Sequence, residues 1–323
     1  MTIALPIIFS IIGFILLLKG SEYLILGSSN IAKSLNIPEI VIGLTIVSIG
    51  TSLPEMGITI TSLAKGYSDM SIGNILGSSI CNLLLILGVS SIISHINLKK
   101  ETRIIEILLS LFLIVLYAIF CNTGNIISKY ESIILIILFV FFLIYTIVMA
   151  KIGKKFDEEN KEDVKASEEE KSNSFFKNII YILIGIIGLK FGGDFIIDNA
   201  VILAKYFKLT EKIISLTILS LGTSLPELVT SAVAARKGNS DISIGNIIGS
   251  NIFNLTLITG VSGLIKPIIF NLEYNLEILI LIYGSILLFA FTLIHPKDKI
   301  TRGRGIIFLN LYLAYMLIML IKL

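Results

Sequence analysis

Long apolar stretches separated by short polar segments dominate this chain of 323 residues. Ten of them approach the roughly 20 residues that an α-helix needs to cross the hydrocarbon core of a bilayer. We therefore predict an all-α, multi-pass membrane protein with ten transmembrane helices. The spans are expected at approximately 4–26, 40–63, 70–94, 103–121, 131–151, 175–203, 212–235, 242–265, 275–294 and 304–321.

The spans fall into two related halves. The hexapeptide GTSLPE occurs at Gly50–Glu55 and again at Gly222–Glu227, and the offset between the copies continues without a gap on both sides. At this offset, 31 of the 52 positions from Ile42 to Ile93 are identical to their counterparts. With five spans in each half, an odd number, the second half must enter the membrane upside down relative to the first, which predicts two inverted repeats. The expected division is 1–151 for the N-terminal repeat, 152–174 for a linker and 175–323 for the C-terminal repeat.

Composition supports a membrane protein and narrows the function. Apolar residues make up 55% of the chain, and the net charge of +3 includes nothing like a basic nucleic-acid patch. Neither a disulfide framework nor a Cys/His cluster of the kind that holds an enzymatic metal is suggested. The first span is not followed by a small-residue cleavage site and is expected to stay as a helix. We expect no enzyme activity, no cofactor, no nucleic acid and no obligate protein partner, with the lipid bilayer as the surroundings.

The distribution of lysine and arginine predicts the orientation in the cell membrane. If the N-terminus is outside, the inner loops carry 17 of these residues and the outer segments carry 7. Basic residues accumulate in cytoplasmic loops. This bias favours extracellular termini and a cytoplasmic 152–174 loop.

The loop itself is rich in acidic residues. A solvated linker between the halves is the favoured interpretation. A calcium-regulatory segment is the alternative, but the loop is shorter than the roughly 50 residues of a small domain. It also lacks the spaced ligands and central glycine of an EF-hand loop.

A polar stripe runs through the second span and is repeated in the seventh. In the second span, helical spacing places hydroxyl side chains on the same face as Glu55, and the seventh span does the same around Glu227. Ionisable residues inside a membrane are costly and indicate a functional site. No lysine or arginine lies in these core spans to neutralise the two glutamates.

Each glutamate is preceded by a proline. Pro54 and Pro226 cannot donate a hydrogen bond to the carbonyl four residues earlier, at Gly50 and Gly222, and they should distort the helix there. Non-helical backbone at membrane depth is tolerated only in a protein interior or around a cavity. Freed carbonyls, hydroxyls and a carboxylate are hard oxygen donors that suit Ca²⁺ or Na⁺.

The third and eighth spans add a second polar stripe. Asn74, Ser78 and Asn82 are four residues apart, as are Asn246, Ser250 and Asn254. Their repetition beside the glutamates favours ion ligation by Ser78, Asn82, Ser250 and Asn254, while Asn74 and Asn246 are expected to be structural. The GxxxG pairs Gly73/Gly77 and Gly245/Gly249 are expected to serve close helix packing. Glu22 and Asp194 are expected near span ends, as interfacial or pairing groups.

The repeated motif GTSLPE followed by SIGNxxGSxxxN resembles the two alpha-repeats of sodium/calcium exchangers in the calcium:cation antiporter superfamily. The resemblance covers essentially the whole chain, and it implies that the second, third, seventh and eighth helices form a diamond around the ions. It implies side-chain ligands at Thr51, Ser52, Glu55, Ser78, Asn82, Thr223, Ser224, Glu227, Ser250 and Asn254, with backbone carbonyls at Ser48 and Ser220. The signature of calcium/proton antiporters is absent.

Asn254 differs from the residue found at this position in a related branch of exchangers. Potassium-dependent exchangers carry Asp where this chain has Asn254, so Glu55 and Glu227 are the only fixed charges of the predicted site. Two negative charges match one Ca²⁺, two Na⁺ or two protons. Charge counting therefore leaves the stoichiometry open.

These observations predict a secondary antiporter that exchanges Ca²⁺ for Na⁺ by alternating access to one shared midplane site. Exchange of Ca²⁺ for H⁺, with the two glutamates as proton sites, is the nearest alternative. A cation channel is a weaker one, because channel filters usually arise from symmetry-related rings or loops.

Overall fold

The computed structural model describes residues 4–100, 102–158, 168–206 and 220–321, and these are helical apart from four two-residue strands and the connecting loops. Seven helices in this part of the chain are long and apolar enough to cross a membrane. The number becomes eight when Glu39–Thr51 and Leu53–Ala64, which meet at a bend of 48°, count as one span. The chain is thus a multi-pass helical membrane protein, as its apolar pattern predicts.

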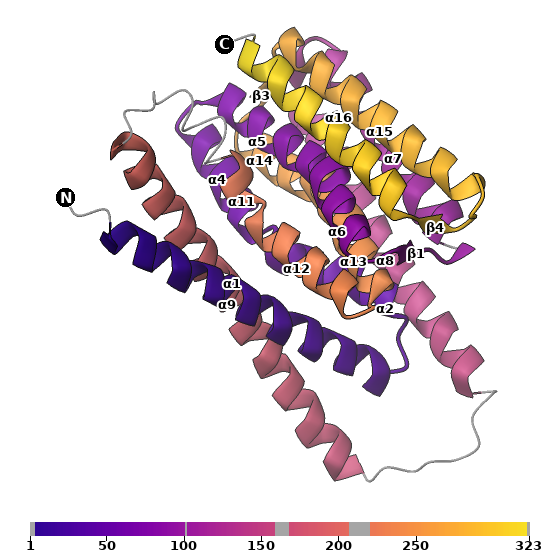
Figure 1. The fold of residues 1–323 in the computed structure, drawn as a ribbon. Coiled ribbons are helices and arrows are strands. Elements are labelled where there is room, and N and C mark those ends of the chain that lie inside the picture. Colours follow the sequence, from indigo (N-terminus) through magenta and orange to yellow (C-terminus); the bar gives the residue numbers. More distant parts are fainter. Residues whose placement is uncertain (1–3, 101, 159–167, 207–219, 322–323) are drawn as a thin grey trace.

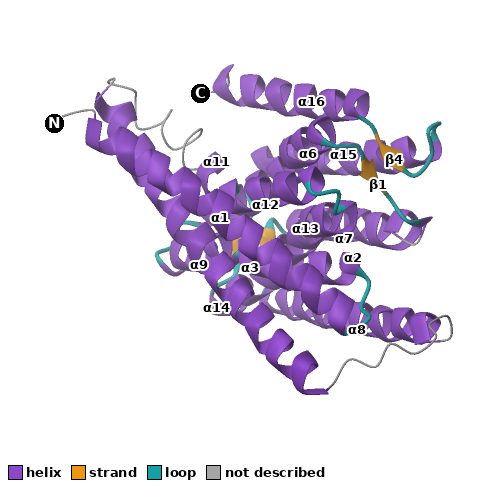
Figure 2. Ribbon diagram, turned by 60° about the horizontal axis from the view of Figure 1, so that its bottom comes forward, coloured by secondary structure: helices purple, strands orange, loops and turns teal. Residues whose placement is uncertain are grey.

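Two long helices form a separate layer. Helix α1 (Ala4–Ser34) lies alongside α9 (Glu168–Tyr206), and both cross one edge of the molecule (Figures 1 and 2). Glycines set their spacing, because a Cβ atom at Gly185 of α9 would lie 2.6 Å from the backbone nitrogen of Leu24. A Cβ atom at Gly20 of α1 would likewise lie 2.8 Å from the nitrogen of Leu189. Small residues allow this backbone-to-backbone approach.

The central helices are broken rather than straight. In the first half, the second span consists of α2 (Glu39–Ile42), a π-helical turn, α3 (Ser48–Thr51) and α4 (Leu53–Ala64). The third span consists of α5 (Ser68–Ile80), a π-helical turn and α6 (Leu87–Ile93). The second half contains α11 (Ser220–Thr223), α12 (Leu225–Arg236), α13 (Ser240–Phe253), a π-helical turn and α14 (Thr259–Ile265). Part of the predicted seventh span, 212–219, lies outside the described residues.

Straighter helices cover the side opposite to α1 and α9 (Figure 1). They are α7 (Ile107–Asn122), preceded by a π-helical turn from Thr102, α15 (Asn275–Leu293), preceded by a 3₁₀ turn from Leu272, and α16 (Arg302–Ile321). Helix α8 (Lys129–Glu158) packs against α14. Large apolar side chains such as Phe141 on α8 and Ile187 on α9 are exposed, as expected for faces that contact lipid.

Two small antiparallel sheets join the halves to each other. Strand β1 (Ile96–Asn97) pairs with β4 (Lys299–Ile300), and β2 (Ile126–Ile127) pairs with β3 (Ile268–Ile269). Each sheet takes one strand from each half. These loop pairings were not predicted from the sequence.

Several predicted boundaries were too short. The first span was expected to end near residue 26, but α1 continues to Ser34, and Gly27 in this extension packs against the backbone oxygen of Asn178 on α9. Helices α8 and α9 also extend into the predicted 152–174 linker. Its central residues, 159–167, lie outside the described part of the chain.

The eighth span packs closely against the second. A Cβ atom at Gly245 would lie 2.9 Å from the Cα of Gly43, and one at Gly249 would lie 2.7 Å from the oxygen of Leu44. Gly73, the counterpart of Gly245, has only the Tyr274 side chain nearby, with its hydroxyl 3.4 Å from the position of a Cβ atom. The packing interpretation is therefore confirmed for the second glycine pair but not for Gly73.

Candidate functional site

The two glutamates lie just after matching helix breaks. Ser52 separates α3 from α4 with φ −88° and ψ 6°, and Ser224 separates α11 from α12 with φ −89° and ψ 6°. Pro54 and Pro226 occupy the first turn of the new helices, where the missing N–H is tolerated. Glu55 and Glu227 thus sit in the first turns of α4 and α12, where the helix dipole favours negative charge.

The structure brings both glutamates into one buried cluster. Glu55 is 2% exposed and Glu227 is 1% exposed. They are close enough for the charge of one to act on the other. Two carboxylates held together away from water need either positive charge nearby or protons to neutralise them. Neither forms an ion pair with a basic side chain in the part of the chain that the structure describes.

A serine of each half lies next to the glutamate of the other half. The Ser52 hydroxyl donates to Glu227 Oε1 at 2.8 Å and also contacts the Ser250 hydroxyl at 3.0 Å. Ser224 approaches Glu55 from the second half, although it makes no hydrogen bond to it. Ser52, one turn before Glu55, therefore neighbours Glu227, and Ser224, one turn before Glu227, neighbours Glu55.

The second polar stripe packs against the two glutamate helices, because the π-helical turn that contains Asn82 contacts α12 and the one that contains Asn254 contacts α4. Ser78, Asn82, Ser250 and Asn254 are all buried. A π-helical turn begins at Cys81 in one half and at Asn254 in the other. The Thr259 hydroxyl donates to the Asn254 carbonyl at 2.9 Å. Single π-helical turns within helices are frequent at functional sites, and these turns were not predicted from the sequence.

Many side-chain oxygens of the predicted ligands are buried and lack hydrogen-bond partners. Within the described residues, seven buried oxygens of the predicted ligands have none: Glu55 Oε1 and Oε2, Glu227 Oε2, Ser78 Oγ, Ser224 Oγ, Asn82 Oδ1 and Asn254 Oδ1. Buried polar atoms are nearly always paired, so such a cluster requires an explanation. Carboxylate, hydroxyl and amide oxygens are the ligands that hard cations prefer.

The remaining predicted ligands contribute in different ways. Thr51 is buried, and its hydroxyl contacts the Ser48 carbonyl and Asn246 Oδ1, both at 3.2 Å. The Ser48 hydroxyl donates to the Leu44 carbonyl at 2.8 Å, and the Ser48 carbonyl accepts from the backbone nitrogen of Ser52 at 3.0 Å. Thr223 is buried in α11. Ser220 begins α11, and its side chain lies outside the described residues.

Asn74 and Asn246 support the glutamate helices. Asn74 Nδ2 donates to the Glu55 carbonyl at 3.2 Å, and Asn246 Nδ2 donates to the Glu227 carbonyl at 3.4 Å. Each also donates to a hydroxyl one turn further along, on Thr59 and Ser231. These bonds agree with a structural role, but the Thr51 contact places Asn246 closer to the ligands than the sequence indicated.

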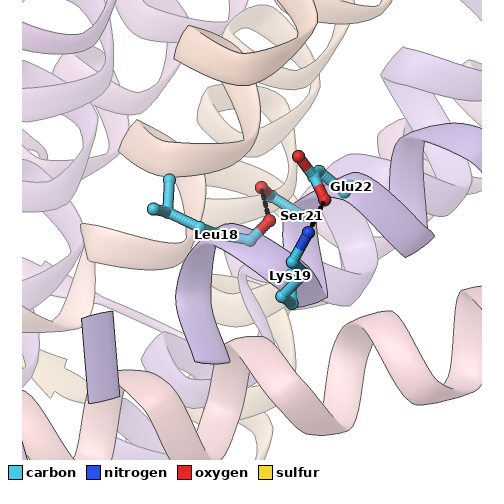
Figure 3. A network of polar contacts seen from close by, with 4 residues as sticks. All are labelled: Leu18, Lys19, Ser21 and Glu22. Carbon is cyan, nitrogen blue, oxygen red and sulfur yellow. Dashed lines mark hydrogen bonds and ion pairs between the residues drawn. The ribbon is translucent and has the colours of Figure 1, made fainter. Parts of the chain in front are cut away.

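Glu22 and Asp194 lie away from the glutamate cluster. Glu22 was expected near the end of a span, which is wrong, because α1 continues for several more turns to Ser34. It pairs with Lys19 on the same helix at 2.8 Å (Figure 3), in keeping with its expected role as a pairing group. Asp194 lies on α9 and lines a cavity together with Lys190.

This cavity of about 650 Å³ lies between α4 and α9 and is lined by residues that neighbour the glutamates in sequence. Among its lining residues, Thr51 and Pro226 are buried, whereas Lys65, Tyr67 and Met70 are exposed. The corresponding surface of α12 is covered instead: Val229 and Ala234 belong to a buried apolar cluster with Leu17 and Leu24 of α1. A cavity therefore borders α4, whereas the matching surface of α12 is covered by α1.

Comparison with known proteins identifies the class. A family model described as sodium/calcium exchanger protein matches residues 5–148 and again 177–321. The chain belongs to the sodium/calcium exchanger family, so the resemblance inferred from the repeated motifs is confirmed.

Particular relatives match along nearly their whole length. An uncharacterised membrane protein of Methanocaldococcus jannaschii, MJ0091, is 36% identical, with 94% of each chain covered. The sodium/calcium exchanger MaX1 of Methanosarcina acetivorans is 29% identical over 96% of this chain and 97% of its own. A solved structure of the sodium-calcium exchanger NCX_Mj, soaked with Na⁺ and Sr²⁺, superimposes with a TM-score of 0.84 at 31% identity and 98% coverage of both chains.

Proposed function

We propose that this protein is a secondary antiporter that exchanges Ca²⁺ for Na⁺ across the cell membrane. The observation that carries the proposal is the cluster of unpartnered buried oxygens around Glu55 and Glu227. Two carboxylates with several hydroxyl and amide oxygens form a site for a hard cation of charge +2 or for two of charge +1. Family membership supports Na⁺ and Ca²⁺ as these cations.

The ions share one site, and each half supplies one carboxylate. The proposed side-chain ligands are Glu55, Glu227, Thr51, Ser52, Thr223, Ser224, Ser78, Ser250, Asn82 and Asn254, with the carbonyls of Ser48 and Ser220. Because occupancy by Ca²⁺ or by Na⁺ satisfies the same two charges, binding of one ion excludes the other. Exchange is obligatory if, in addition, the site opens to one side at a time and does not change sides while its two negative charges are empty of cations.

Alternating access would come from moving α1 and α9 across the central helices. The glycine contacts between these two helices favour movement as one unit. In the present arrangement α9 leaves the cavity along α4 open, while α1 covers α12. A shift of the pair that covers α4 and uncovers α12 would open the site to the other side.

This mechanism assumes ten spans in two inverted five-helix repeats. Both termini would then be extracellular, the 152–174 loop would be cytoplasmic, and the cavity along α4 would open outward. The bias of 17 to 7 basic residues supports this orientation. A cysteine replacing Ser167, in a chain lacking Cys81 and Cys121, should react with impermeant thiol reagents only from the cytoplasmic side.

Ion flux in reconstituted vesicles tests the function. Uptake of ⁴⁵Ca²⁺ into Na⁺-loaded vesicles should require an outward Na⁺ gradient and should be little affected by a pH gradient of the same size. Uptake driven by the pH gradient alone would establish the Ca²⁺/H⁺ alternative, in which the two glutamates carry the protons. Uptake without any counter-ion gradient would indicate a channel instead.

A further inference from the structure

The two asparagines at equivalent positions of the repeats are held differently. Asn82 Nδ2 donates a hydrogen bond to Asn251 Oδ1 at 3.1 Å. Asn254 corresponds to Asn82, yet neither of its amide atoms has a hydrogen-bond partner among the described residues. All three side chains are buried, and Asn251 itself is 2% exposed.

A single sequence difference between the halves accounts for this asymmetry. In the alignment of the two repeats, the counterpart of Asn251 is Ser79. The Ser79 hydroxyl is directed back to its own helix, where it donates to the Ile75 carbonyl at 2.8 Å. The first half therefore offers Asn254 no acceptor equivalent to the one that Asn251 gives to Asn82.

The contact decides which amide atom faces the ions. A side-chain amide binds a cation through its oxygen, whereas its NH₂ group is a donor and needs an acceptor elsewhere. In Asn82 the NH₂ group is engaged by Asn251, while Oδ1 is one of the seven unpartnered oxygens. The hydrogen bond thus keeps the oxygen of Asn82 free for coordination.

We propose that Asn251 is a positioning residue that orients Asn82 toward the transported cation. The inference rests on the proposed function, because it assigns a supporting role at the same site. Groups that orient ligands typically change metal affinity about 10- to 100-fold when they are lost. Asn254, which has no such support, is the less preorganised of the two amide ligands.

A double-mutant cycle on Ca²⁺ binding tests this role. Asn251→Leu removes the acceptor at nearly constant size, and we expect it to weaken Ca²⁺ binding to the purified protein about 10-fold by titration calorimetry. In an Asn82→Ala background, which has no amide to orient, the same change should alter the Kd by less than about 2-fold. Transport in vesicles should show a raised KM for Ca²⁺ with a nearly unchanged maximal rate.

Controls separate orientation from general packing. Ser79→Ala removes the repeat counterpart, which bonds only within its own helix, and it should leave the Kd for Ca²⁺ unchanged. Asn251→Ser, which copies the first half, serves if the leucine variant does not fold. A loss that persists in the Asn82→Ala background, or no loss at all, overturns the proposal. If Glu55→Gln also leaves Ca²⁺ binding intact, the proposed site itself is wrong.

Discussion

At the scale of single residues, the glutamates supply the charge and their neighbours supply the geometry. Ser52 ties the first half to Glu227, while Asn74 and Asn246 fix the backbone at the two glutamates. The charges and the polar stripes could be predicted from the sequence, because it shows both the acidic residues within apolar spans and the helical spacing of the polar residues around them. The contacts between halves could not, since they depend on how distant segments pack.

Loss of either carboxylate should abolish exchange. Glu55→Gln and Glu227→Gln keep the volume of the side chain but remove half of the negative charge that faces Ca²⁺. We expect Na⁺-driven ⁴⁵Ca²⁺ uptake to fall at least about 100-fold, since the amide leaves one positive charge uncompensated in a buried site. Glu273→Gln, an exposed acid before α15, is the matched control and should transport normally. Near-normal uptake by a folded glutamine variant would contradict the assignment.

The amide at Asn254 should make exchange independent of potassium. Related potassium-dependent exchangers carry Asp at this position, and Asn254 adds no charge that a third type of cation would balance. Replacing K⁺ by choline on both sides of the vesicle should leave the rate of Ca²⁺ uptake unchanged. Asn254→Asp is the complementary variant, and a collapse of wild-type uptake without K⁺ would refute the prediction.

At the scale of elements, the breaks in the central helices position the glutamates as much as the helices do. Pro54 and Pro226 indicated the breaks in the sequence, but the residues that adopt the non-helical conformation are Ser52 and Ser224. The π-helical turns at Cys81 and Asn254 have no proline or glycine signal, and they could not be read from the sequence. The length of α1 was also missed, because its last turns are polar, and their contacts with Asn178 of α9 depend on how distant segments pack.

Contact between α1 and α9 should depend on the absence of side chains at the glycines. Gly185→Ala places a methyl group 2.6 Å from the Leu24 nitrogen, so the helices must move apart. Overpacking of this kind costs about 1–3 kcal/mol, and we expect a lower melting temperature together with slower exchange. Gly303→Ala is the control, since nothing lies within 4 Å of its added methyl group. Equal melting temperatures for the two variants would show that the close contact is unimportant.

At the scale of the whole molecule, the two halves share a sequence pattern but not the same surroundings. The stretch of α4 after Glu55 borders the cavity of about 650 Å³, and the matching stretch of α12 lies against α1. Sequence symmetry predicted the repeats and the location of the site. It could not predict which half would be open, because nearly identical motifs permit either arrangement and the packing of α1 and α9 selects one.

The difference between the cavity beside α4 and the covered surface of α12 can be measured at one pair of equivalent positions. Gly57 lines the cavity and has nothing within 4 Å of an added Cβ atom, so a cysteine fits there. Its counterpart in the second repeat is Val229, which is buried against α1. In a chain lacking Cys81 and Cys121, Gly57→Cys should react with an impermeant thiol reagent added outside. Val229→Cys should resist the same reagent added from the cytoplasmic side.

The reactivities should change in opposite directions when the ion gradients favour the other state. The proposed movement of α1 and α9 would cover α4 and uncover α12 at the same time. A condition that slows labelling at Gly57→Cys is therefore expected to speed labelling at Val229→Cys, because in a two-state equilibrium the population that one state loses is gained by the other. Labelling rates at both positions, measured over a range of Na⁺ and Ca²⁺ concentrations on each side, check this reciprocity. If both sites become accessible together, the molecule opens as a continuous pore, and the exchange mechanism built on alternating access fails.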